Sequence, residues 1–78
     1  MAVTTFNRHA DVTPNDSTVF PEESSIYVGT GGDIALVLVG DSTVVTYKNV
    51  PDGTLLPCNV EKVMATNTTA GSIVRGYN

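Results

Sequence analysis

The sequence has few of the residues that usually stabilise or equip a small domain. Among its 78 residues there is one cysteine, Cys58, and one histidine, His9. A disulfide within the chain is therefore excluded, and too few cysteine and histidine ligands are present for a structural zinc site. A chain of this length buries only about 60% of the surface that its unfolded form exposes. Since small domains are commonly stabilised by disulfides, metals or association, we expect a homo-oligomer without cofactor or metal.

Basic residues and long apolar runs are also scarce. The four cations are scattered along the chain, and the net charge is -4. Without a basic cluster, binding to the phosphates of a nucleic acid is not expected. No apolar run approaches the roughly 20 residues of a membrane helix, and the N-terminus lacks the layout of a signal peptide. We therefore expect no nucleic-acid or membrane partner, and synthesis in a cytoplasm.

Two runs rich in Val, Ile, Leu, Thr and Tyr dominate the middle of the sequence, at residues 33–50. They flank Gly40-Asp41-Ser42, which predicts a β-hairpin with a short turn. In the first arm, residues of both parities are apolar, so neither face of that strand suits water. This arm is predicted to lie in the interior of the fold.

Further strands are predicted at residues 25–28, 54–65 and 72–77. The apolar parity shifts near Glu61, which predicts either a β-bulge or the end of the strand. Pro57 predicts that its strand starts at an edge or lacks one backbone hydrogen bond. Five or six short strands without a helical period indicate an all-β protein, either a small β-sandwich or a jelly-roll-like barrel. The β-sandwich body is expected to span residues 26–78.

Residues 1–25 are predicted to form an extended N-terminal arm. They contain two prolines and only scattered apolar residues, a composition that cannot bury itself but can lie on a neighbour. Both phenylalanines of the chain occur here. The side chains expected to contact a neighbouring molecule or subunit are Phe6, Val12, Val19 and Phe20.

No catalytic site is expected. His9 lies in the predicted arm, far in sequence from the strands on which a preorganised catalytic group is usually built. Cys58 lies between Leu56 and Val60 at an apolar parity, which favours a buried small side chain over a nucleophile. Adjacent carboxylates at Glu22 and Glu23 point apart in an extended chain, so they do not form a cooperating acid and base.

Several phrases, in a characteristic order and spacing, extend over residues 12–77. They are Ile26-Tyr27-Val28-Gly29, Gly32-Asp33-Ile34, Val44-Val45-Thr46-Tyr47-Lys48-Asn49-Val50-Pro51-Asp52-Gly53, Leu55-Leu56-Pro57, and Val63-Met64-Ala65-Thr66-Asn67-Thr68-Thr69-Ala70-Gly71. In these phrases the chain resembles the head spike base proteins of tailed phages and gene transfer agents. It departs from that pattern at Glu61-Lys62-Val63, where the family has a more basic strand, and at Arg75-Gly76-Tyr77, where the family has a more apolar end.

The resemblance implies a non-enzymatic virion protein that assembles as a homo-oligomer, a trimer or pentamer, on the exterior of the capsid. Its expected partner is the major capsid protein, so that Phe6, Val12, Val19 and Phe20 are expected to contact the capsid or another subunit. A head fibre protein is a second partner if the chain forms the base of a spike. A cement or decoration protein and a spike base both remain open. From a different class, a carbohydrate-binding adhesion module of a virion is the alternative. Assembly in a reducing host cytoplasm agrees with the lack of disulfides.

Overall fold

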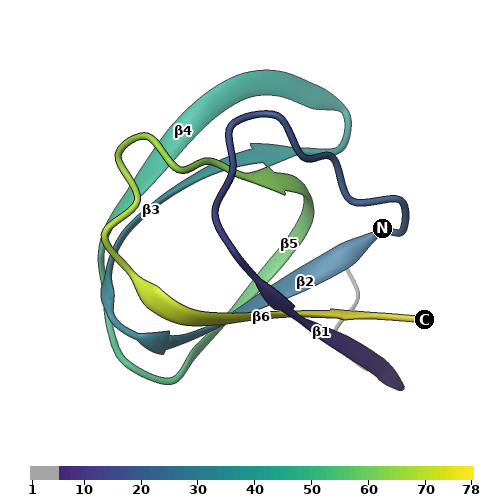
Figure 1. Ribbon diagram of the computed structural model, residues 1–78, viewed down its shortest axis with the longest axis horizontal. Coiled ribbons are helices and arrows are strands. Elements are labelled where there is room, and N and C mark those ends of the chain that lie inside the picture. Colours follow the sequence, from purple (N-terminus) through teal and green to yellow (C-terminus); the bar gives the residue numbers. More distant parts are fainter. Residues whose placement is uncertain (1–5) are drawn as a thin grey trace.

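The computed structural model describes residues 6–78 and contains six β-strands (Figure 1). The described residues contain no helix that could cross a membrane. The predicted all-β class is confirmed. The strands are β1 (Arg8–Val12), β2 (Ser24–Thr30), β3 (Gly32–Leu38), β4 (Asp41–Val50), β5 (Thr54–Val63) and β6 (Gly71–Tyr77).

All six strands pair antiparallel in one sheet, in the order β1-β6-β2-β5-β3-β4. Figure 1 shows that this sheet curls round, so that one face encloses the interior of the molecule. The small β-fold expected from the sequence is thus a single strongly curved sheet, with no second sheet packed against it in the described part of the chain. Strands β1 and β4 form its two edges.

The hydrophobic core lies on the inner face of the curved sheet. Its members come from β2, β3, β5 and β6, from Val50 at the end of β4 and from Ala70 in the loop before β6, so no two neighbouring strands suffice to build it. Burying an aliphatic side chain of this size contributes about 1.5 to 3 kcal/mol. The core cluster consists of Ile26, Val28, Ile34, Leu36, Val50, Leu56, Val60, Val63, Ala70 and Ile73.

The predicted hairpin at residues 33–50 is present as β3 and β4. Strand β3 lies between β5 and β4 and has four consecutive buried residues, 34–37, which confirms that this arm is interior. Strand β4, in contrast, is an edge strand. Its Val44 and Val45 are 47% and 49% exposed, because they have a neighbouring strand on one side only.

Strand β5 is interior yet irregular, and Pro57 explains part of the irregularity. Ser24 pairs with Val60, and Ile26 pairs with Leu56. A step of two residues along β2 therefore corresponds to a step of four residues along β5. Pro57 falls within this interruption, where a missing N–H disturbs no regular pairing. On the other side of β5 the register shifts again between Lys62 and Val60. The parity shift near Glu61 is therefore a bulge within the strand rather than its end.

The loop between β5 and β6 is fastened to β3 by hydrogen bonds. The carbonyl oxygen of Asp33 accepts from the backbone N–H groups of Thr69 (2.8 Å) and Ala70 (3.0 Å). The Thr69 hydroxyl oxygen accepts from the Asp33 N–H at 2.9 Å, and the Thr68 hydroxyl oxygen accepts from the Ala35 N–H at 3.0 Å. These bonds hold the loop beside the start of β3 in one position.

Candidate functional site

The described part of the predicted arm lies along the body. Strand β1 pairs with β6 from Arg8 opposite Tyr77 to Val12 opposite Ile73, and Val12 packs against the core. Phe6 lies with its ring over Gly76, where a Cβ atom would overlap ring carbons. Glycine at this position therefore leaves the space that the ring occupies. Residues 1–5 of the predicted arm lie outside the described residues.

Beyond β1, the chain follows the end of β5. The N–H of Asn15 donates to the carbonyl oxygen of Val63 at 2.9 Å, and the N–H of Phe20 donates to the carbonyl oxygen of Glu61 at 2.8 Å. Phe20 packs against the core, whereas Val19 is 53% exposed. Of the four side chains predicted to contact the capsid or another subunit, Val19 is thus the one most open to a partner.

Arg75 fastens the segment before β2 to β6. Its Nη1 and Nη2 atoms each lie 3.2 Å from Oε1 of Glu22, and Nη1 donates to Oγ of Ser24 at 3.0 Å. The guanidinium also lies over the rings of Tyr77, at 4.0 Å from the ring centroid, and Phe20, at 5.1 Å. These contacts combine an ion pair with cation–π stacking, and they give Arg75 a role within the fold.

Asp16 fastens the other end of the same segment. Its Oδ1 accepts from the backbone N–H groups of Ala65 (2.8 Å) and Thr66 (3.0 Å), and its Oδ2 accepts from the Thr66 hydroxyl at 2.7 Å. The bonds from the N–H and the hydroxyl of Thr66, followed by the Ala65 N–H and the charge of Lys62, hold the pKa of Asp16 below its ordinary value of 3.8. Asp16 therefore binds as the carboxylate.

Stability should depend on the charge of Asp16. Because the folded state lowers its pKa, the carboxylate stabilises the fold at pH values above its unfolded-state pKa, and this contribution is lost as the pH falls through the folded-state pKa. Asp16→Asn should lower the melting temperature at neutral pH. As the pH is lowered, the melting temperature of this variant should fall less than that of the wild type. Melting curves recorded from neutral pH to about pH 2 test this. Asp11→Asn, on exposed β1, is the control, and equal acid sensitivity of wild type and Asp16→Asn would contradict the assignment.

The outer face of the sheet carries an apolar row. Tyr27 on β2 is the register partner of both Leu55 on β5 and Val74 on β6. Residues paired in this way project from the same face, and Tyr27 and Leu55 are both exposed large side chains. The outer apolar row consists of Tyr27, Leu55 and the half-exposed Val74.

His9 and Cys58 are not brought together. His9 is exposed on β1 and Cys58 is half-buried on β5, and two strands separate β1 from β5 in the sheet. The Cys58 sulfur lies 3.9 Å from the hydroxyl of Tyr47; this contact, together with burial, raises the pKa of Tyr47. Residues 6–78 contain no group of three or more His, Cys, Asp or Glu side chains that could hold a metal ion.

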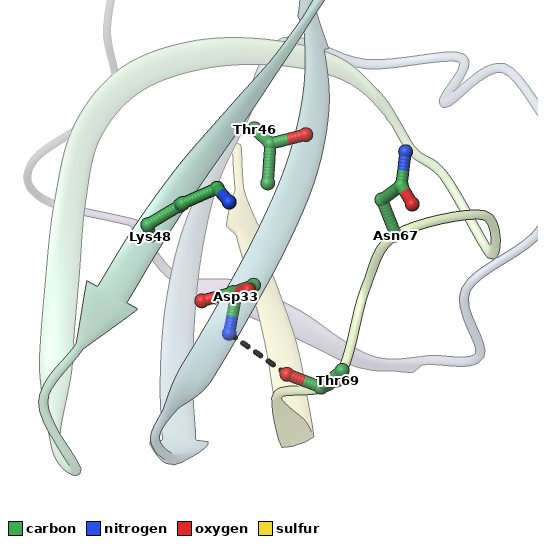
Figure 2. A pocket seen from close by; sticks show the side chains of 5 residues that line it. All are labelled: Asp33, Thr46, Lys48, Asn67 and Thr69. Atoms are coloured by element: carbon green, nitrogen blue, oxygen red, sulfur yellow. Dashed lines mark hydrogen bonds between the residues drawn. The ribbon is translucent and has the colours of Figure 1, made fainter.

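A polar pocket of about 270 Å³ lies between β3, β4 and the loop that precedes β6. Figure 2 shows its side chains: Thr46 and Lys48 come from β4, Asn67 and Thr69 come from the loop, and Asp33 lies between them. The lining presents one ammonium, one carboxylate, one carboxamide and two hydroxyl groups. It has no aromatic or purely aliphatic side chain, so the lining offers chiefly hydrogen-bonding groups.

Sequence reasoning did not identify this pocket. Its residues belong to three separate segments, and the polar ones at positions 33 and 67–69 are of types that are common in turns. The one local signal is the row of hydroxyl and amide side chains in Thr66-Asn67-Thr68-Thr69, which is also typical of an ordinary turn. Only the pairing of β3 with β4 and the fastening of the loop on β3 bring the five side chains together.

No protein-family model matches the sequence, and no curated protein matches it either. A match is found among solved structures, to a chain of the "Capsid of native GTA particle computed with C5 symmetry", where GTA denotes gene transfer agent. The two chains share 36% sequence identity and superpose with a TM-score of 0.74. The match covers 95% of this chain and 84% of the other.

Proposed function

The chain belongs to the same family as a chain of a gene transfer agent capsid, and from this relationship we propose that it is a structural protein of a phage-like virion, bound to the exterior of the capsid. The observation that carries the proposal is the 36% identity over 95% of the chain. At this level of identity and coverage the likeness extends beyond the fold. A non-enzymatic role is part of the same proposal.

In detail, we infer a cement or decoration protein that stabilises the head, or the base on which a head spike or fibre stands. The major capsid protein is the partner, and the chain acts as a trimer or pentamer after assembly in the host cytoplasm. A small core supports association, because neighbours that bind only the folded state add to its stability. The two unpaired sheet edges, β1 and β4, are available for subunit contacts in the described structure.

The four predicted contact residues differ in how far they are exposed to solvent. Val19 is exposed and contacts the capsid or a neighbouring subunit directly. Val12 and Phe20 pack against the core and Phe6 lies over Gly76, so these three hold the segment that presents Val19. Deletion of residues 1–20 would test whether the predicted arm binds the capsid. In this structure, deletion would also remove β1, and a point substitution is the sharper test.

Val19→Asp should weaken binding to capsids that lack this protein at least about tenfold, because a carboxylate placed in an apolar contact loses its hydration. Its melting temperature should stay close to that of the wild type, since substitutions at exposed sites usually change stability by less than about 0.5 kcal/mol. Cosedimentation with capsids measures the binding. Thr18→Asp is the matched control at the adjacent exposed position, and unchanged binding of Val19→Asp would refute the contact.

The mass of the purified protein, measured by light scattering with and without capsids, tests the function as a whole. A trimer or pentamer that binds capsids and raises their resistance to heat supports a cement role. Binding without added resistance supports the base of a spike or fibre. A monomer that does not bind capsids would contradict the virion assignment and leave the carbohydrate-binding adhesion module, the second candidate, which the polar pocket favours.

A further inference from the structure

We propose that the polar pocket formed by Asp33, Thr46, Lys48, Asn67 and Thr69 binds one neutral, hydroxyl-rich sugar unit. The pocket lies at one end of the sheet, where the start of β3 meets β4 and the loop before β6 (Figure 2). Val19 does not line the pocket, although the segment that carries Val19 binds the same loop through Asp16, which accepts from Ala65 and Thr66. The proposed sugar site therefore uses different side chains from the proposed capsid contact at Val19.

The charges in the pocket favour a neutral ligand. Asp33 places a carboxylate in the lining, which disfavours an anion, and Lys48 places an ammonium there, which disfavours a cation. Lys48 has no hydrogen-bond or ion-pair partner among the described residues, so its three donors can serve a ligand. A ligand with several closely spaced groups that each donate and accept hydrogen bonds can accept from the Lys48 ammonium and donate to the Asp33 carboxylate at the same time. The hydroxyl groups of a sugar ring have this property.

Hydrogen-bonding capacity remains on the other side chains as well. Oγ1 of Thr69 accepts from the Asp33 N–H, which leaves its own O–H to donate. Oδ1 of Asp33 accepts from the Asn49 N–H at 3.1 Å, which orients the carboxylate and leaves Oδ2 as an acceptor. Asn67 adds an amide with both donors and an acceptor. Each type of bond that a sugar hydroxyl makes therefore has a partner in the lining.

The pocket is preorganised. The loop that carries Asn67 and Thr69 is fastened to the carbonyl oxygen of Asp33 by two backbone bonds. Asn67 itself has a φ of 67°, a left-handed conformation that asparagine tolerates better than most residues. Since the loop is already ordered, binding would not have to pay the entropy of ordering it.

Size and composition set the expected affinity. A volume of about 270 Å³ lies just below the usual range of ligand pockets, about 300 to 1,000 Å³, and suits a single sugar ring. Without an aromatic platform, one site should bind in the millimolar range. Many copies on one particle would raise the effective affinity for a polysaccharide by roughly 10² to 10⁴. This multivalent step, unlike the site itself, rests on the proposed virion function.

Titration of the ¹⁵N-labelled full chain with glucose, galactose, mannose and N-acetylglucosamine tests the site. For at least one sugar, amide shifts should be confined to residues near 33, 46–48 and 67–69, with a Kd of about 1 to 10 mM. Lys48→Met and Asn67→Gly should each weaken that binding at least about tenfold. Glycine retains access to positive φ at position 67 while removing the amide. Thr43→Val, an exposed hydroxyl on the same strand outside the pocket, should bind as the wild type.

Three outcomes would overturn the proposal: no shifts with any of the four sugars, shifts outside the pocket, or equal shifts with sodium acetate, which would indicate an anion site. Cosedimentation of the same variants with capsids tests capsid binding independently of sugar binding. Lys48→Met should bind capsids as the wild type does. If it loses capsid binding, the pocket is a protein contact and the sugar assignment is wrong. If sugar binds while the wild type ignores capsids, the sugar site stands and the virion function fails.

Discussion

Replacement of Ile26 by alanine should lower the free energy of unfolding by about 2 to 5 kcal/mol. Ile26 is fully buried in the core cluster, on a strand that is paired on both sides, opposite Leu56 of β5 and Arg75 of β6. Truncation removes buried methyl and methylene groups and leaves a cavity that two paired neighbours keep from collapsing. Because domains of this size have little stability to lose, the variant should be largely unfolded well below the melting temperature of the wild type.

Urea unfolding followed by circular dichroism measures the loss, at two protein concentrations so that association is separated from folding. Val45→Ala is the matched control, since Val45 is 49% exposed on the edge strand β4. It should change the free energy of unfolding by less than about 0.5 kcal/mol. Similar losses for Ile26→Ala and Val45→Ala would show that β2 is not in the centre of the core.

Replacement of Arg75 by alanine should cost about 2 kcal/mol, which is less than the loss of a core aliphatic side chain but large for a charged residue. Its side chain is only 12% exposed, whereas that of Glu22 is 36% exposed, so solvent screens the ion pair and the pair alone contributes little. Most of the cost should come from the stacking on Tyr77 and Phe20 and from the Ser24 hydroxyl, which loses a charged donor while buried.

Arg75→Lys separates charge from shape. Lysine keeps the positive charge but cannot place two donors on Glu22 while lying flat over Tyr77, so it should recover no more than about half of the loss. Glu22→Gln should cost less than Arg75→Ala, and Arg8→Ala, on the exposed edge strand β1, should cost about nothing. If Arg75→Lys has the stability of the wild type, only the charge of Arg75 matters and the stacking is irrelevant.

Arg75 and Pro57 show which structural features could be predicted from the sequence and which could not. Arg75 belongs to the ending at which the chain departs from the more apolar pattern of the family that it resembles. In the folded chain it closes over Glu22 and Ser24, more than 50 residues earlier. Pro57 was predicted either to place the start of its strand at an edge or to lack one backbone hydrogen bond; β5 is interior, and Pro57 falls at its register shift, because proline lacks an N–H wherever it occurs. The backbone chemistry of a single residue predicts its local structure. A contact partner far away in the sequence cannot be inferred from that residue alone.

The sequence by itself determined the strands β2 to β6, the turn of the central hairpin and the apolar character of both faces of β3, whereas β1 lies in the segment predicted to be an extended arm. These follow from contiguous residues, since alternation, β-branched content, glycine and proline act on the local backbone. Its resemblance to spike base proteins also pointed to the capsid relationship that the solved structure supports.

Only the tertiary structure decided the order β1-β6-β2-β5-β3-β4, in which β3 and β4 are the one neighbouring pair that is consecutive in the chain. That order places β4 at an edge, β1 against β6, and the five polar side chains around one pocket. The physical reason is that strand pairing is chosen by the burial of the whole core at once, through contacts between residues far apart in sequence. No local pattern records which distant strands will meet.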